Sequence, residues 1–475
     1  MSKPADLQPA NTQPLVVEEK KPDVLPDEVV LPLSLDISNL NFSEKYGVIK
    51  DATFKSYGND KLILRNGFFL GNKNWLFSKE NVQGENITFI YKDAEKRISK
   101  VFIFHKSNYN IELELEVTNL SNTVQSFDLP LILGTLNFSS EPSQSPYLDV
   151  VIGQPEKTHH VNGRKNMAFA DNKFLAIRNR YFCAIIEPTL NKYTAFVEKV
   201  SNNESEVGLR SQQFTLNPNQ SWKEKFRIYL GPQDLKQIEK SNPIWTNVIY
   251  YGSFDIISQI LLSILEFLQR LVHSLGLAIV MLSILIYFLL FPLTVKQMRS
   301  MKEMQLLQPR IEELKKDCKD NPQKLNKEIM ELYREHKVNP LGGCLPVVLQ
   351  IPIFFALYQA LVRTIALKGA KFLWIKDLSQ PDRLFSLPVN LPFLGNAFNI
   401  LPILMAIGMF VQQKTTATSS AGMSSEQQKM MLILFPVMFG LIFYNMPSGL
   451  VLYWFTNSIF TLIYQIRING TPRTS

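Results

Sequence analysis

The stretch SLGLAIVMLSILIYFLLFPLTV, residues 274–295, contains 22 residues without a charge. At about 1.5 Å of rise per residue, a helix of this length crosses a hydrocarbon core of about 30 Å. The stretch therefore predicts a membrane-spanning helix. It also marks a change along the chain, because the residues before it mostly alternate between polar and apolar, while those after it form further long uncharged runs.

Four more spans are predicted after residue 340. The segment NMPSG, residues 445–449, interrupts the last uncharged run, and its Pro and Gly demand a turn that splits the run into two antiparallel helices. The five predicted transmembrane helices cover residues 274–295, 341–363, 396–413, 430–446 and 450–467.

The overall composition conceals these spans. With 46% hydrophobic and 19% charged residues, the chain of 475 residues resembles a soluble protein, because a polar half and an apolar half are averaged. The net charge of +8 could suggest nucleic acid, but most basic residues lie beside apolar segments, as they do at a membrane flank. Cys183, Cys318 and Cys344 are too few and too widely spaced for a disulfide framework or a metal site, so we expect no cofactor and no metal.

The first half predicts an all-β domain at residues 33–235. In the segment IELELEV, residues 111–117, apolar side chains alternate with glutamates, as in a strand with one buried and one solvated face. His159 and His160 are adjacent in such a pattern and should point to opposite faces, so we interpret them as surface residues and not as a catalytic or metal-binding pair. Residues 1–32 are rich in Pro, Glu, Asp and Lys and predict a disordered linker; we expect a membrane helix to precede them.

Residues 236–273 are predicted to form a linker and an amphipathic helix. From Asp255 to His273, apolar residues recur at helical spacing opposite Ser, Gln, Glu and Arg. Because a span follows directly, we expect this helix to lie in the membrane interface; a core helix of the β domain is the alternative.

Residues 296–340 predict a cytoplasmic helical hairpin. Residues 296–337 carry eleven Lys and Arg against eight acids, and the positive-inside rule places this segment in the cytoplasm and the β domain outside. Asn321 and Pro322 are suited to begin the second helix as its N-cap and first residue. Two apolar stripes should pair, namely Met304, Leu307, Ile311 and Leu314 on one helix and Leu325, Ile329 and Leu332 on the other. Contact of this segment with nucleic acid or the ribosome stays open on charge alone.

The sequence contains no enzymatic motif: no P-loop, no GxSxG, no HExxH and no paired carboxylates in a span. The predicted spans instead contain neutral polar residues and prolines. These polar groups either hydrogen-bond between helices or line a wet cavity, and the sequence does not choose between the two.

Several motifs resemble those of the YidC family of bacterial membrane protein insertases. They are FPLT (291–294), LQPRIEELKK (307–316), LYREHKVNPLGGCLPVVLQIPIFFALY (332–358), FLWIKDLS (372–379), FPVMF (435–439) and PSGLVLYWFTN (447–457), with IYLGPQDL (228–235) at the end of the β domain. The resemblance implies a periplasmic β-supersandwich, a multi-pass location in the inner membrane, and no enzymatic activity. It also implies insertion of nascent membrane proteins, alone or beside the Sec translocon and the ribosome, through a hydrophilic groove within the membrane.

Carried over by position, the groove residues are Tyr287, Gln350, Trp454, Thr456 and Asn457. Tyr287 stands where the family has an arginine, so the groove lacks this charge. Three explanations of this tyrosine are open: an engineered substitution, a natural groove that works by polarity alone, or a chain that is impaired for some substrates. A small-molecule carrier or channel and a sugar-binding envelope enzyme are the rival functions.

Overall fold

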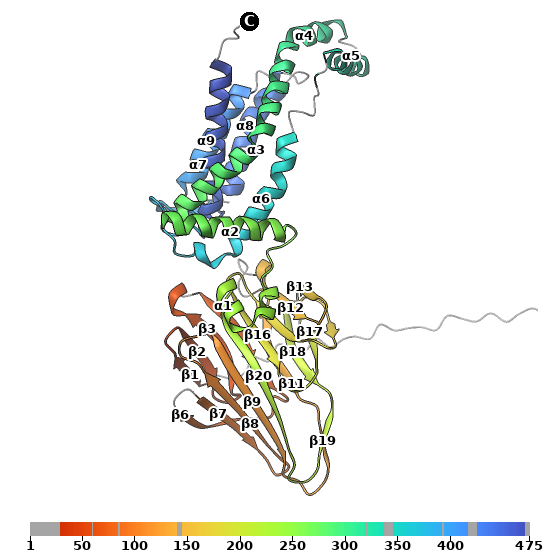
Figure 1. Cartoon of the computed structure of the whole chain (residues 1–475), viewed down its shortest axis with the longest axis vertical. Coiled ribbons are helices and arrows are strands. Elements are labelled where there is room, and N and C mark those ends of the chain that lie inside the picture. Colours follow the sequence, from red (N-terminus) through yellow and green to blue (C-terminus); the bar gives the residue numbers. More distant parts are fainter. Residues whose placement is uncertain are drawn as a thin grey trace, which may run out of the picture. The chain divides into compact units, whose positions relative to one another are not determined.

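The computed structural model describes residues 29–58, 60–83, 86–139, 145–318, 321–336, 338, 345–391, 394–416 and 425–470. The chain divides into two compact units, Met1–Val248 and Ile249–Ser475 (Figure 1). Most of the predicted linker 1–32, the start of the predicted span 341–363 and Cys344 lie outside the described residues.

The first unit is built from antiparallel sheets. Its largest sheet has the strand order β13-β12-β15-β16-β20-β9-β8-β7-β6 within the described residues. These strands are β6 (Ser78–Gln83), β7 (Asn86–Lys92), β8 (Lys96–Phe104), β9 (Asn110–Asn119), β12 (Asp149–Gly153), β13 (Thr158–Val161), β15 (Phe174–Arg178), β16 (Phe182–Pro188) and β20 (Ser221–Pro232).

Smaller sheets accompany this large one. Their orders are β1-β2-β3-β4, β14-β17-β18-β11-β5 and β10-β19. The strands are β1 (Val30–Ser34), β2 (Ser38–Ser43), β3 (Val48–Phe54), β4 (Lys61–Gly67), β5 (Phe69–Leu70), β10 (Gln125–Phe127), β11 (Pro130–Asn137), β14 (Met167–Phe169), β17 (Tyr193–Lys199), β18 (Glu204–Ser211) and β19 (Phe214–Leu216). The unit ends with α1 (Leu235–Ser241) and the 3-10 helix η3 (Pro243–Val248).

The strand expected at residues 111–117 is confirmed. It forms the middle of β9, and its Ile, Leu and Val side chains are buried while its glutamates are not. The glutamates face a row of bases on β20: Lys223 lies 3.3 Å from Glu116 and Lys225 lies 3.3 Å from Glu114. Alternation therefore separates the apolar core on one face from a solvated ladder of opposite charges on the other.

Aromatic rings join the sheets into a sandwich. Phe42 of β2 packs against Phe89 of β7 and Phe102 of β8, with ring centroids 5.9 and 5.5 Å apart. Lys100 of β8 is fully buried beside this cluster, and its Nζ donates to the carbonyls of Gly47 (2.6 Å) and Phe68 (2.7 Å). These bonds tie the loop after β2 and the end of β4 to the large sheet.

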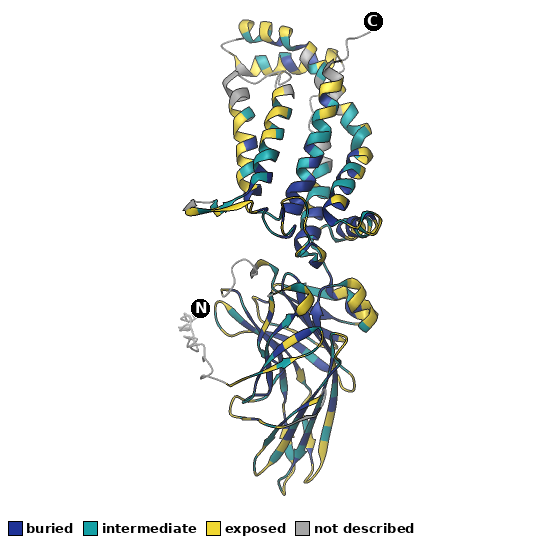
Figure 2. Cartoon of the chain, turned by 90° about the vertical axis from the view of Figure 1, so that its left-hand side faces the viewer, coloured by how far each residue is buried: buried dark blue, intermediate teal, exposed yellow. Residues whose placement is uncertain are grey.

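The second unit is helical. Its helices are α2 (Asp255–Val272), α3 (Leu275–Leu306), α4 (Gln308–Asp317), α5 (Pro322–Glu335), α6 (Leu345–Arg363), α7 (Ile400–Thr416), α8 (Ser425–Tyr444) and α9 (Ser448–Gly470). A 3-10 turn η5 (Ile365–Leu367) and the hairpin of β21 (Phe385–Leu391) and β22 (Gly395–Phe398) lie between α6 and α7. Figure 2 shows that buried residues concentrate at the end of this unit where α2 lies, and become fewer towards α4 and α5.

Helix α3 extends past the end that the sequence predicts for the first span. It continues from residue 295 to Leu306, because the segment KQMRSMKEMQL contains strong helix formers and no residue that ends a helix. By length and hydropathy, two helices in the described part of the chain can cross a membrane, Leu275–Lys296 and Ser448–Arg467, while Ile400–Lys414 and Leu432–Tyr444 are shorter apolar helices. The count of five spans stays a prediction.

The buried lysine generates a prediction about pH. Burial lowers the pKa of Lys100 to about 7, whereas an unfolded chain keeps this proton up to a pH of about 10. Between these values the unfolded state binds more protons, so this residue makes the free energy of unfolding rise with pH. Urea unfolding followed by tryptophan fluorescence should show this rise in the wild-type protein relative to Lys100→Met. Equal slopes from pH 7 to 9.5 in both proteins would show that the carbonyls of Gly47 and Phe68 keep the ammonium charged.

Candidate functional site

The helices of the second unit do not pack uniformly. Helix α9 packs along α3 and α7, and α8 packs on α7. Helix α6 rests mainly on α2 and contacts α3 and α9 much less. The buried core that these helices share lies near α2 and includes Leu275, Ala278, Ile279, Leu282, Ala356, Ala360, Leu401, Met405, Phe443, Leu450 and Val451.

A loop closes the bundle at the end where α9 begins. Leu367 and Leu378 in the segment after α6 are fully buried in the helical core. The backbone N–H groups of Ser448 and Gly449 donate to the carbonyls of Gln380 (2.8 Å) and Leu378 (2.9 Å). Protein therefore covers this end of the bundle, and the first backbone donors of α9 are satisfied by the loop.

The same loop also fixes the start of α7. The buried carboxylate of Asp382 accepts hydrogen bonds from the backbone N–H groups of Ile400 and Leu401, both at 2.9 Å, and from the Trp374 indole at 3.2 Å. A carboxylate at a helix N-terminus satisfies otherwise unpaired donors and interacts favourably with the helix dipole. The loop is thus held at both α7 and α9.

Three of the five predicted groove residues converge on one face of α9. Tyr287 of α3 is buried, and its ring contacts Phe460 of α9 at 5.8 Å. Gln350 of α6 lies beside the hydroxyl of Tyr453, without a hydrogen bond of ordinary geometry. Asn457 lies one helical turn from both Tyr453 and Phe460, on the same face.

The other two predicted groove residues differ from each other in their surroundings. Trp454 packs in an aromatic cluster with Phe354 of α6 at 5.1 Å and Phe443 of α8 at 5.5 Å. Thr456 is buried, and its hydroxyl donates to the carbonyl of Leu452 at 2.8 Å. Residues 454 and 456 point about 160° apart from each other on a helix, so these two side chains do not share a face with each other.

Sequence reasoning missed the tyrosines of this face. Tyr453 and Tyr464 recur at helical spacing around Asn457, and the ring centroids of Tyr464 and Phe291 of α3 are 4.8 Å apart. Within the described residues, the hydroxyls of Tyr287 and Tyr453 are buried without a hydrogen-bond partner. A buried polar atom without a protein partner favours a site that water or a polar chain enters.

The predicted hairpin stripes meet in one cluster. Leu307, Ile311, Ile329 and Leu332 are buried together, with Met304, Leu314 and Leu325 packed against them. Asn321 caps α5 as expected, because its side chain accepts from the backbone N–H of Lys324 at 3.0 Å. Met304, however, belongs to the last turn of α3 and not to the first hairpin helix. Tyr333 joins the cluster although it was not predicted.

Helix α2 has three kinds of surface. Leu261, Leu265 and Leu268 are buried against the bundle. Ser258, which the sequence assigned to the polar face, is also buried, because its hydroxyl donates to the carbonyl of Ala356 at 2.8 Å. A second surface is apolar but exposed, formed by Ile256, Ile260, Phe267 and Leu271. The third is polar, formed by Gln259, Glu266 and Arg270.

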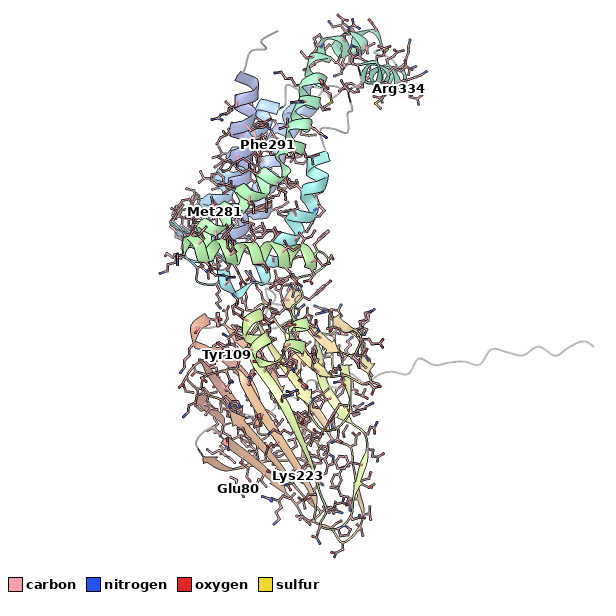
Figure 3. The ribbon with its side chains drawn as sticks, in the orientation of Figure 1. Glu80, Tyr109, Lys223, Met281, Phe291 and Arg334 are labelled. Atoms are coloured by element: carbon pink, nitrogen blue, oxygen red, sulfur yellow. The ribbon has the colours of Figure 1, made fainter. Side chains whose placement is uncertain are left out.

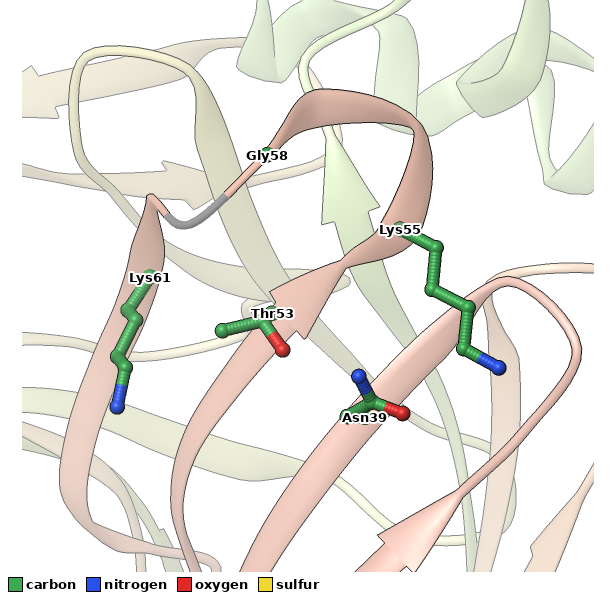
Figure 4. Close-up of a pocket in the computed structure, with 5 residues that line it drawn as sticks. All are labelled: Asn39, Thr53, Lys55, Gly58 and Lys61. Atoms are coloured by element: carbon green, nitrogen blue, oxygen red, sulfur yellow. The ribbon is translucent and has the colours of Figure 1, made fainter.

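The β unit offers little for catalysis. His159 and His160 lie half-buried on the edge strand β13, where His159 pairs with Gln154 at 3.1 Å. Among the described residues no group of His, Cys, Asp and Glu could hold a metal. A shallow pocket of about 340 Å³ is lined by Asn39, Thr53, Lys55, Gly58 and Lys61 (Figure 4). Its two lysines are engaged, Lys55 with the carbonyl of Leu35 and Lys61 with Asp51.

A separate β-sandwich unit and a bundle with apolar outer surfaces and polar, uncharged groups inside define the class of this chain, which is an integral membrane protein. The family described as "60Kd inner membrane protein" matches residues 267–474, and the one described as "YidC periplasmic domain" matches residues 72–264. The chain belongs to the YidC family of membrane protein insertases. Insertases of this family are not enzymes, as the sequence also predicts for this chain.

Curated relatives support this assignment. The chain is 37% identical over 380 residues to the membrane protein insertase YidC of Pelobacter propionicus, which covers 78% of this chain and 69% of the relative. It is 34% identical over 446 residues to the membrane protein insertase YidC of Geotalea uraniireducens, and the match covers 91% of this chain and 79% of the relative. A crystal structure described as an active YidC insertase with its first transmembrane domain resolved is 19% identical, covers 94% and 93% of the two chains, and has a TM-score of 0.43.

The hairpin cluster generates a prediction about local stability. Ile311 is 1% exposed in this cluster, so Ile311→Ala should destabilise the pairing of α4 and α5 by about 2–4 kcal/mol through lost burial and a cavity. Amide hydrogen exchange in α5 should become correspondingly faster. Met330→Ala, at a side chain that is 56% exposed on the same hairpin, is the control and should change exchange little. Equal exchange in the wild-type protein and Ile311→Ala would contradict the packing.

Proposed function

We propose that this chain inserts hydrophobic segments of nascent membrane proteins into the inner membrane without catalysis. The observation that carries the proposal is an asymmetry of the helical unit. Loop residues are buried at the end where α9 begins, while Tyr287 of α3 and Gln350 of α6 each lie against the same face of α9. Such an interior suits a polar chain that enters from one side and cannot leave through the other.

The physical basis is a difference in solvation. A polar flank in hydrocarbon costs several kcal/mol for each unpaired group, and a hydrated groove lowers this cost. The apolar segment of the substrate meanwhile gains about 0.8 kcal/mol for each CH₂ group that it transfers from water to lipid. Burial of the apolar segment can therefore drive insertion, so no nucleotide is needed.

The orientation that we propose follows from charge. The hairpin α4–α5 would lie in the cytoplasm, because its segment carries eleven Lys and Arg and the loops near α9 carry few. The β unit and the closing loop would then lie in the periplasm. Arg334 of α5 points away from the bundle (Figure 3), and the exposed surface of this hairpin is where we propose contact with the incoming chain, the ribosome or the Sec translocon.

Insertion into proteoliposomes that contain only this chain tests the proposal. A short single-span protein should become protected from protease in the absence of ATP, and protection equal to that in empty liposomes would contradict an autonomous insertase. Deleting residues 33–232 should leave insertion in place, because the proposed groove lies in the helical unit. Gln350→Leu with Asn457→Leu should slow insertion roughly tenfold, about 1–2 kcal/mol for lost polar contacts. Thr456→Val is the matched control and should stay near wild type, since this hydroxyl is bonded within α9.

Tyr287 generates a second prediction, about substrate charge. Its ring lies between α3 and α9, but its neutral hydroxyl cannot attract an acidic flank. Tyr287→Arg should therefore speed insertion of substrates with acidic N-terminal tails several-fold, and should leave substrates with neutral tails unchanged. Tyr287→Phe, which keeps the ring, controls for packing. Equal rates with Tyr and Arg for an acidic tail would show that charge at this position does not select substrates.

A further inference from the structure

The hairpin of β21 and β22 is an apolar structure that protein does not cover. It forms a sheet of two strands in the described residues, and Phe385 of β21 stacks on Phe398 of β22 with ring centroids 4.7 Å apart. Phe385 is nevertheless 50% exposed and Val389 is 62% exposed. A two-stranded hairpin is at best marginally stable in water, so an uncovered apolar face needs another partner.

The sequence of β21 is mostly apolar. Phe385, Leu387 and Val389 alternate with Ser386 and Pro388 in the sequence, and the pairing of β21 with β22 is irregular between Ser386 and Leu391. Ser386 and Pro388 are exposed as well. Since Phe385, Ser386, Pro388 and Val389 are all exposed, this stretch of β21 is not buried against the helices, and most of the surface that it exposes is apolar.

The hairpin projects parallel to the expected membrane surface. In Figure 2 it extends sideways from the end of the helical unit, across the direction of α3 and α9, at the level of α2. Helices that cross a bilayer stand roughly upright in it, so an element that projects across them at one end runs along the bilayer surface. The hairpin is also continuous with α7, which begins at Ile400 directly after it.

The neighbouring loop adds an aromatic residue and positive charge. Leu373 is 75% exposed, and Trp374 keeps its ring exposed while its Nε1 donates to Asp382. Lys371, Lys376 and Arg383 around this patch are exposed. The carboxylate of Asp382 is buried under backbone N–H groups, and the partly exposed Asp377 is the one acid beside these three bases, so the net charge of the patch is positive and complements anionic phosphates.

We propose that the β21–β22 hairpin, together with Leu373 and Trp374, is a lipid anchor that lies in the headgroup region of the outer leaflet. Its apolar side enters the acyl boundary, and the surrounding bases contact lipid phosphates. The anchor holds the loop that closes the bundle, because Asp382 and Gln380 connect the same segment to α7 and α9. This proposal rests on the membrane location of the helices and does not depend on insertion activity.

Spin labels on β21 test the anchor in the full chain. Val389→Cys and Ser386→Cys are labelled separately after Cys318 and Cys344 are replaced by serine; Cys183 is fully buried and stays unlabelled. Each protein is reconstituted at low density into vesicles of phosphatidylethanolamine and phosphatidylglycerol. Collision of the label with oxygen and with a water-soluble nickel complex is then measured. The label at 389 should collide several-fold less with nickel than the label at 386, and more with oxygen.

Two outcomes would overturn the proposal. High access of nickel to both labels would mean that the apolar residues of β21 face water in a lipid bilayer, so that no lipid anchor exists. Protection at 389 that disappears on further dilution of the protein in lipid, with spin–spin broadening at high density, would mean that a second copy covers it. Protection that persists at every dilution supports the lipid anchor.

Discussion

The cost of placing an unpaired polar group in hydrocarbon governs the helical unit. Its effect is visible where α7 and α9 begin. The N–H groups of Ser448 and Gly449 in α9 donate to loop carbonyls, and those of Ile400 and Leu401 in α7 donate to Asp382. A hydroxyl within a helix is also paired: the Ser283 hydroxyl donates a hydrogen bond to the carbonyl of Ile279 at 2.7 Å. Against this background, the hydroxyls of Tyr287 and Tyr453 are two buried polar groups without a hydrogen-bond partner that lie along one face of α9.

The β unit meets a comparable cost in a different way. Lys100 is buried completely, yet its Nζ lies within bonding distance of backbone carbonyls and 5.2 Å from the Phe77 ring centroid. Carbonyls and aromatic faces compensate in part for lost hydration. Both units therefore place polar groups in apolar surroundings; Lys100 has carbonyl partners, whereas the hydroxyls of Tyr287 and Tyr453 on the α9 face have none.

Patterns that are local in sequence could be predicted well. The alternation in residues 111–117 gives β9, the apolar spacing in residues 304–332 gives the hairpin cluster, and Asn321 caps α5. Contacts between distant segments could not be predicted in this way. Ser258 is polar and was assigned to water, but α6, about a hundred residues later, supplies a carbonyl that accepts from its hydroxyl.

The candidate site shows the same limit. Position in a motif placed Trp454, Thr456 and Asn457 together, whereas helix rotation separates Trp454 from Thr456; Thr456 and Asn457 both lie one turn before Phe460, which contacts Tyr287. The β21–β22 hairpin was not predicted, although Phe385, Leu387 and Val389 alternate with polar or small residues. A three-residue alternation beside long apolar spans is a weak signal, because its partner strand becomes evident only once the chain has turned back on itself.

The length of α3 and the proline within it have a mechanical consequence. Its 32 residues form one rod of about 48 Å that carries Tyr287 along its length and ends at the hairpin cluster. Pro292 lies between these two places and lacks the N–H that would bond to the carbonyl of Phe288. The rod thus consists of two stiff arms with a compliant joint, so a force applied to the hairpin bends α3 at Pro292 before it displaces Tyr287.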